Sequence, residues 1–141
     1  MEKLVIFVPH QDDETNLAGN ILSYLVKNYD VYVVYSSLEV NPDKASIRKK
    51  EAVNACAVYG IEKDNVIFGE FPDTPNRNGH HFFTDGDKSI TLKFEEILRK
   101  LMPEVIIGTD FDFHSDHRMV SLALDEAVFN IMNKIKKFVG L

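Results

Sequence analysis

The chain has little of what several classes of protein require. It contains one cysteine, Cys56, among 141 residues, so an internal disulfide is excluded and nothing indicates an oxidising compartment. Its apolar runs are short, and the one near the start, residues 4–8, is too brief for a signal peptide or a membrane span. We therefore expect a cytoplasmic protein with no membrane partner.

Positive charge is also scarce. Lysine and arginine together number 16 against 22 acidic residues, which gives a formal net charge of −6. The short basic runs at 47–50 and 134–137 have the character of solvated helix faces, so no nucleic-acid partner is expected. Neither a Gly-x-Gly-x-x-Gly fingerprint nor a Walker loop follows the first apolar run, so the motifs of dinucleotide and P-loop sites are missing.

What the chain does have is a regular alternation of strand-like and helix-like segments. A long irregular segment at 72–89 interrupts it, and we expect this loop to be functional or mobile. The predicted strands are residues 4–8, 30–35, 66–68 and 105–107. The first predicted helix follows Glu14 and contains Leu17, Ile21, Leu22 and Leu25, and the second spans 45–59 and is closed by Gly60. The third spans 91–101, and the fourth begins at Asp116 or His117 and contains Ile131 and Ile135.

This alternation predicts an α/β fold with right-handed crossovers. We expect a Rossmann-like three-layer α/β/α architecture with a mainly parallel sheet, in a single domain over residues 1–141. Ligands of such sheets bind beyond the carboxyl ends of the strands. Polar side chains follow each predicted strand at that edge: His10, Ser36, Ser37, Asp73 and His114.

Two polar clusters at this edge point to a metal site. The first, residues 10–14, reads His-Gln-Asp-Asp-Glu, and the second, 114–117, reads His-Ser-Asp-His. Catalytic zinc sites use three ligands from such residues and leave a position for water, whose proton a nearby carboxylate accepts. One aspartate of the first cluster can ligate while the other acts as base, and one histidine of the second can ligate while the other stabilises charge.

Simpler interpretations were weighed against the metal site. The three acids of the first cluster could merely favour a helix N-terminus, and His117 alone could be a core histidine. His80 and His81, in the irregular segment, are expected to be exposed or to face the substrate rather than to bind metal. The coincidence of both clusters favours the metal interpretation.

The two clusters resemble the signature of the PIG-L/LmbE-like zinc N-deacetylases, which carry His-x-Asp-Asp-Glu after the first strand and His-x-Asp-His after a later one. Two intermediate features are similar as well. Arg48 and Glu51 match an Arg-x-x-Glu helix that ends in glycine, and Pro72-Asp73 matches a Pro-Asp turn after the third strand. The resemblance covers nearly the whole chain in the same order.

The resemblance implies a role for each residue. It implies removal of an N-acetyl group from a GlcNAc-like amino-sugar conjugate, by attack of a water bound to Zn²⁺; Fe²⁺ would suit the same ligands. The implied metal ligands are His10, Asp13 and His117, and the implied base is Asp12. His114 would stabilise the oxyanion, and Asp116 would orient His114. Arg48 and Asp73 would bind the substrate.

The chain departs from the resemblance in its length. Family members are expected to continue beyond the second cluster, so we expect a domain that lacks the family's C-terminal portion. Residues 37–40 also differ from the small-residue turn expected there. Two other functions stay open: an amidase acting on a sugar or thiol conjugate, and a truncated metal-binding remnant without turnover. A shortened domain should cover its exposed surface by forming a homo-oligomer.

Overall fold

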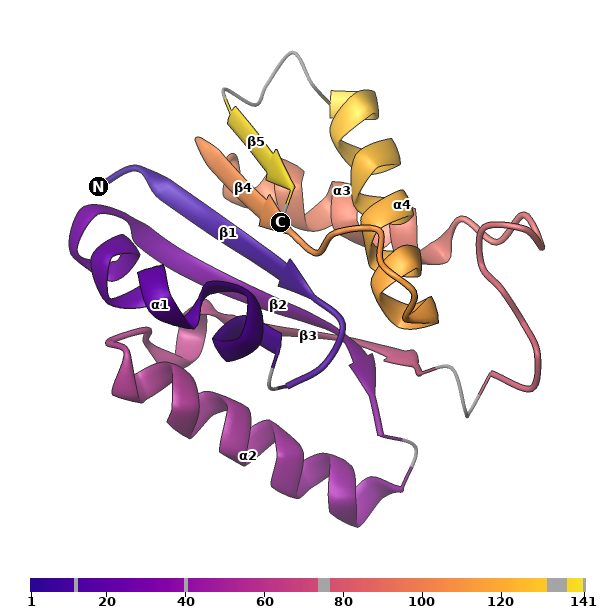
Figure 1. Ribbon diagram of the computed structural model, residues 1–141, viewed down its shortest axis with the longest axis horizontal. Coiled ribbons are helices and arrows are strands. Elements are labelled where there is room, and N and C mark those ends of the chain that lie inside the picture. The colour runs from indigo at the N-terminus through magenta and orange to yellow at the C-terminus, as the bar shows by residue number, and fades with distance from the viewer. Residues whose placement is uncertain (12, 40, 74–76, 132–136, 141) are drawn as a thin grey trace.

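Five parallel strands form a single sheet in the part of the chain that the computed structural model describes, residues 1–11, 13–39, 41–73, 77–131 and 137–140. The order across the sheet is β3-β2-β1-β4-β5 (Figure 1). The strands are β1 (Lys3–Val8), β2 (Asp30–Leu38), β3 (Val66–Pro72), β4 (Val105–Gly108) and β5 (Lys137–Gly140). Each pair of neighbouring strands is parallel, which confirms the predicted α/β architecture.

Two pairs of helices cover the two faces of the sheet (Figure 1). They are α1 (Asp13–Asn28) and α2 (Pro42–Val58) on one face, and α3 (Ser89–Leu101) and α4 (Ser115–Ile131) on the other, with a short 3-10 helix at Lys63–Asn65. Successive side chains of β1 point to opposite faces of the sheet, so the core has two parts, one on each face. Val5 and Phe7 pack with α3 and α4, whereas Leu4 and Ile6 pack with α1 and α2.

Local sequence explains where the helices begin and end. Asn41 caps α2, because its side-chain oxygen accepts the N–H groups of Asp43 and Lys44. Gly60, with φ +90°, closes the same helix as predicted. The predicted inward face of α3, which includes Phe94 and Leu98, is buried. The hydrophobic spacing therefore identified the core-facing sides of these helices.

Some elements differ from the sequence prediction. The second strand does not stop at residue 35 but continues through Ser36 and Ser37, where an irregular register against β3 buries both serines. Ile21, one of the apolar residues at helical spacing in α1, is 42% exposed. β5 was not predicted at all, because the preceding apolar residues had helical spacing; Ile135 lies outside the described residues.

The chain reverses its direction of travel across the sheet at β1. It moves from β1 outward to β2 and β3, and then returns to pair β4 on the other side of β1. In open parallel sheets such a reversal separates the loops that follow the two central strands and leaves room for a ligand at their carboxyl ends. The two polar clusters follow β1 and β4.

Candidate metal centre and substrate cleft

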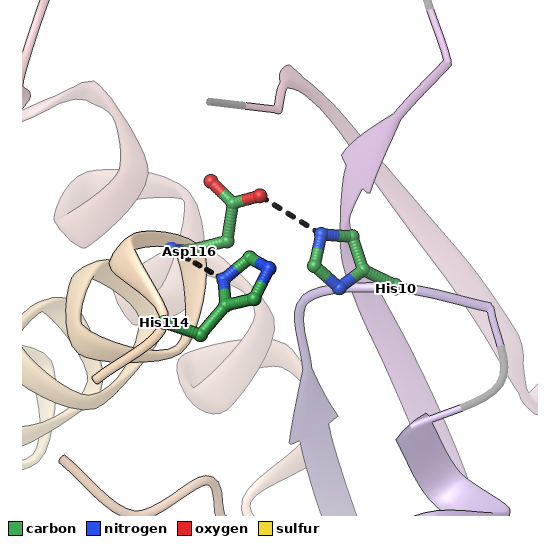
Figure 2. A group of neighbouring side chains, drawn as sticks. All are labelled: His10, His114 and Asp116. Carbon is green, nitrogen blue, oxygen red and sulfur yellow. Dashed lines mark hydrogen bonds and ion pairs between the residues drawn. The ribbon is translucent and has the colours of Figure 1, made fainter. Parts of the chain in front are cut away.

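Three side chains from the two clusters converge beyond the carboxyl ends of β1 and β4. Potential ligand atoms of His10, His114 and Asp116 all lie within 4.8 Å of one another. Figure 2 shows the Asp116 carboxylate directed at the His10 ring, with the His114 ring beside them. The His117 ring joins this group, because its centroid lies 4.8 Å from that of His114 and 5.9 Å from that of His10. The structure therefore brings together residues that are more than 100 positions apart.

The turn that carries His10 is fixed by its neighbour strand. The Pro9 carbonyl accepts the N–H of Ser37 at 2.8 Å, and the Gln11 side chain donates to the Ser37 carbonyl at 2.9 Å. Both bonds join the turn after β1 to the end of β2. His10 is consequently held in place while its side chain stays 24% exposed and open to a ligand.

The first turn of α4 arranges the second cluster. The backbone N–H of Asp116 donates to Nδ1 of His114 at 3.1 Å, and the Thr109 hydroxyl donates to the carbonyl of His117 at 3.2 Å. Asp112 accepts the N–H of His114 through one oxygen, at 2.7 Å, and contacts Nδ1 of His117 through the other, at 2.9 Å. The pKa of the Asp112 carboxyl is lowered chiefly by the His114 N–H; desolvation opposes this shift, and the His117 ring adds to it.

Two of the histidines thus each contact a carboxylate through one ring nitrogen. Asp116 contacts Nε2 of His10 at 2.8 Å, and Asp112 contacts Nδ1 of His117. Metal-binding histidines characteristically donate their second ring N–H to a carboxylate, which fixes the tautomer and orients the ring. Carboxylate contacts of this kind are consistent with a metal site that includes His10 and His117.

Asp116 differs in its contacts from the expected role. The resemblance implied that its carboxylate would orient His114, whereas its Oδ2 contacts His10 and its Oδ1 accepts a bond from Arg77. The backbone N–H of Asp116 donates to the His114 ring. Both carboxylate oxygens of Asp116 thus have partners, and the implied role of Asp116 in orienting His114 stays a prediction.

The structure describes only part of the first cluster, residues 10–14. Asp12, the expected base, lies outside the described residues, as does the side chain of Asp13 at the start of α1. Arg48 and Asp73, the expected substrate-binding residues, do come together. They line a cleft of about 170 Å³ with four other residues: His10, Gln11, Ser37 and Glu39.

The other histidines lie apart from this cluster. His80 contacts Asp85 and Asp87, each at 3.0 Å, while His81 accepts the N–H of Thr84. These bonds stabilise the loop between β3 and α3. The expectation that neither histidine binds metal stays a prediction.

Sequence reasoning missed two residues of the site, Arg77 and Asp112. Arg77 lies in the irregular segment, where arginine is normally exposed, and no spacing connects it with Asp116. Asp112 offered a signal, because it precedes the second histidine motif by only two positions. Acids close to a predicted ligand are candidates for orienting it.

Comparison with solved structures shows the same fold in proteins of several descriptions. A deacetylase from the teicoplanin biosynthesis pathway has a TM-score of 0.76 and 18% identity, and the match covers 92% of this chain and 64% of that one. The N,N'-diacetylchitobiose deacetylase from Pyrococcus horikoshii has a TM-score of 0.74 and 21% identity, with 91% of this chain and 49% of that one covered. A 4-carboxy-2-hydroxymuconate hydratase, GalB, from Pseudomonas putida KT2440 has a TM-score of 0.70 and 20% identity, with 92% of this chain and 56% of that one covered. The chain spans about half to two thirds of the length of these structures.

No curated protein sequence matches the chain. No helix among the described residues is both long and apolar enough to cross a lipid bilayer. A family model does match. It is described as PIG-L, GlcNAc-PI de-N-acetylase, and it aligns with residues 5–128, which include both histidine clusters and the helices and strands between them. By this match, and with the fold and the histidine clusters just described, the chain belongs to the PIG-L family.

Proposed function

We propose that this protein is a metal-dependent hydrolase that removes an N-acetyl group from a GlcNAc-like amino-sugar conjugate. The observation that carries the proposal is the convergence of His10, His114 and Asp116 within 4.8 Å, next to the cleft that Arg48 and Asp73 line. Membership of the PIG-L family and the deacetylases among proteins of the same fold support it.

The proposed cofactor is Zn²⁺, with Fe²⁺ suited to the same donors. His10, Asp13 and His117 would hold the ion, which supplies a Lewis acid that acidifies water and polarises the amide carbonyl. Support for the two histidines comes from their carboxylate partners, Asp116 and Asp112.

The chain's own residues would carry the protons and bind the substrate. Asp12 accepts a proton as water adds to the acetyl carbon. His114 donates a hydrogen bond to the oxygen that becomes negatively charged, and protonates the nitrogen as the C–N bond breaks. The products are acetate and a free amine. Arg48 and Asp73 offer a donor and an acceptor to sugar hydroxyls from the wall of the cleft.

Asp12 gives the sharpest test. Acetate release from N-acetylglucosamine conjugates is measured with purified protein whose zinc content is determined on the same sample. We expect Asp12→Asn to bind zinc but to release acetate at least about 100-fold more slowly, because general base catalysis contributes about 10²–10⁴-fold. The control is Asp64→Asn, an exposed acid remote from the cleft, which should match wild type.

The ligand assignment needs its own comparison. His10→Ala should lose bound zinc, whereas His80→Ala, which alters a histidine outside the cluster, should retain it. Full activity of Asp12→Asn would refute the base assignment. Absence of zinc binding by wild type after reconstitution would refute the metal centre.

A second candidate function is hydration, favoured by the likeness of the fold to the hydratase. If zinc binds but no acetate is released, 4-carboxy-2-hydroxymuconate is the substrate to try, with loss of its conjugated absorbance as the signal. Amidase activity is checked in the same way by amine release from conjugates with other acyl groups. Zinc binding without any turnover would favour a metal-binding remnant.

A further inference from the structure

Arg77 is a buried cation in the segment between β3 and α3. Its side chain is 3% exposed, and its Nη2 donates to Oδ1 of Asp116, which is equally buried in the first turn of α4. A buried arginine is unusual unless it is paired, and this pair joins residues 39 positions apart. The guanidinium also lies over the Phe82 ring, 5.7 Å from its centroid. The contact therefore fixes this segment against α4.

The Asp116 carboxylate connects Arg77 to His10. One oxygen accepts from Arg77, and the other lies 2.8 Å from Nε2 of His10 (Figure 2). A carboxylate can only accept a hydrogen bond, so Nε2 carries the proton and the lone pair of the neutral ring is on Nδ1. In this way the position of the Asp116 side chain determines both the angle and the tautomer of His10.

We infer that Arg77 is a positioning residue for the metal centre. It holds the buried Asp116 carboxylate by compensating its charge, and through it presents Nδ1 of His10 to the ion. The inference deepens the proposed function and relies on its metal site. It predicts that the loop before α3 contributes to metal affinity without contacting the ion.

Lys88 provides a matched comparison. It comes from the same loop, lies over the Phe83 ring at 5.1 Å, and pairs with Glu126 of α4 at 2.9 Å. Its side chain is 51% exposed, and within the described part of the chain Glu126 forms no hydrogen bond to a histidine. Lys88→Met thus removes a cation, a ring contact and a bond to α4, but leaves His10 untouched.

The test measures Zn²⁺ affinity by competition with a chelating dye, together with ring-nitrogen NMR spectra of metal-free protein. We expect Arg77→Met to bind Zn²⁺ about 10–100-fold more weakly, the range seen when the partner of a metal-binding histidine is lost. Arg77→Lys should recover part of this loss, because it restores the charge without the planar fork. Lys88→Met should bind as wild type.

The NMR spectra separate positioning from simple stabilisation. In metal-free wild type, His10 should show the Nε2–H tautomer, with its signals assigned by their loss in His10→Gln. Arg77→Met should show a mixture of tautomers, and Lys88→Met should not. This measurement on wild type does not require Arg77→Met to fold, so an Nδ1–H tautomer of His10 would overturn the inference even if Arg77→Met is unfolded by circular dichroism.

Two results would overturn the inference: an Nδ1–H tautomer in wild type, or wild-type zinc affinity in Arg77→Met. Failure of wild type to bind zinc would instead refute the proposed function. The tautomer of His10 in the metal-free protein would still show whether Arg77 and Asp116 position this ring.

Discussion

Single residues around the histidines carry most of the functional argument. His10, His114 and His117 come from the two sequence motifs, but their orientation depends on Asp116 and Asp112. Neighbouring acids are not equivalent here. Asp110 accepts the adjacent N–H of Phe111, whereas Asp112 contacts two of the histidines.

This difference between two acids leads to a prediction for Asp112→Asn. The amide keeps the size of the side chain but loses the charge that favours a donating Nδ1–H on His117. We expect Zn²⁺ affinity to fall by about 10-fold, the lower end of the effect of such partners. Competition with a chelating dye measures it, and Asp110→Asn is the control. Equal affinity of the two variants would show that Asp112 does not support the site.

At the scale of elements, the approach of α4 to the sheet depends on a glycine in β4. A Cβ atom built on Gly108 would lie 2.5 Å from Cδ2 of Leu124, which is 1% exposed in the core. A fully buried side chain has little room to move away. Gly108 therefore allows α4, with Asp116 and His117 in its first turn, to lie close to the end of β4.

Gly108→Ala should destabilise the protein through this crowding. We expect the free energy of unfolding to fall by about 1–3 kcal/mol, the usual cost of extra volume in a packed core. Urea denaturation measures the change. Combining Gly108→Ala with Leu124→Val should cost less than the sum of the two single changes, because the shorter side chain makes room. Additive losses would contradict the crowding explanation.

Elements with strong local signals were predicted from the sequence, and those fixed by distant contacts were not. The buried face of α3 follows from its hydrophobic spacing, and the end of α2 at Gly60 follows from residue type. β3 continues past residue 68 through Gly69 and Glu70, although Glu70 has φ +63°, which a strand pattern does not indicate. The burial of Arg77 also depends on a partner that is distant in the sequence, Asp116, so it could not be predicted from the residues around Arg77.

At the scale of the whole molecule, we propose that the chain forms a homo-oligomer. Several large apolar side chains are exposed, and association would remove some of this surface from water. Phe113 is 90% exposed, Val58 85% and Phe129 72%. Sedimentation velocity over a range of concentrations should therefore show a dimer or a larger species. A single monomeric species at all concentrations would contradict the proposal.

The pairing of β1 with β4 has a consequence for synthesis of the protein. Residue 10 leaves the ribosome early, but its partners at 114–117 follow about a hundred residues later. A nascent chain that has folded only its first βαβαβ portion would present His10 without the second cluster. Tight capture of an ion by the proposed metal site would therefore wait until α4 has been made and docked.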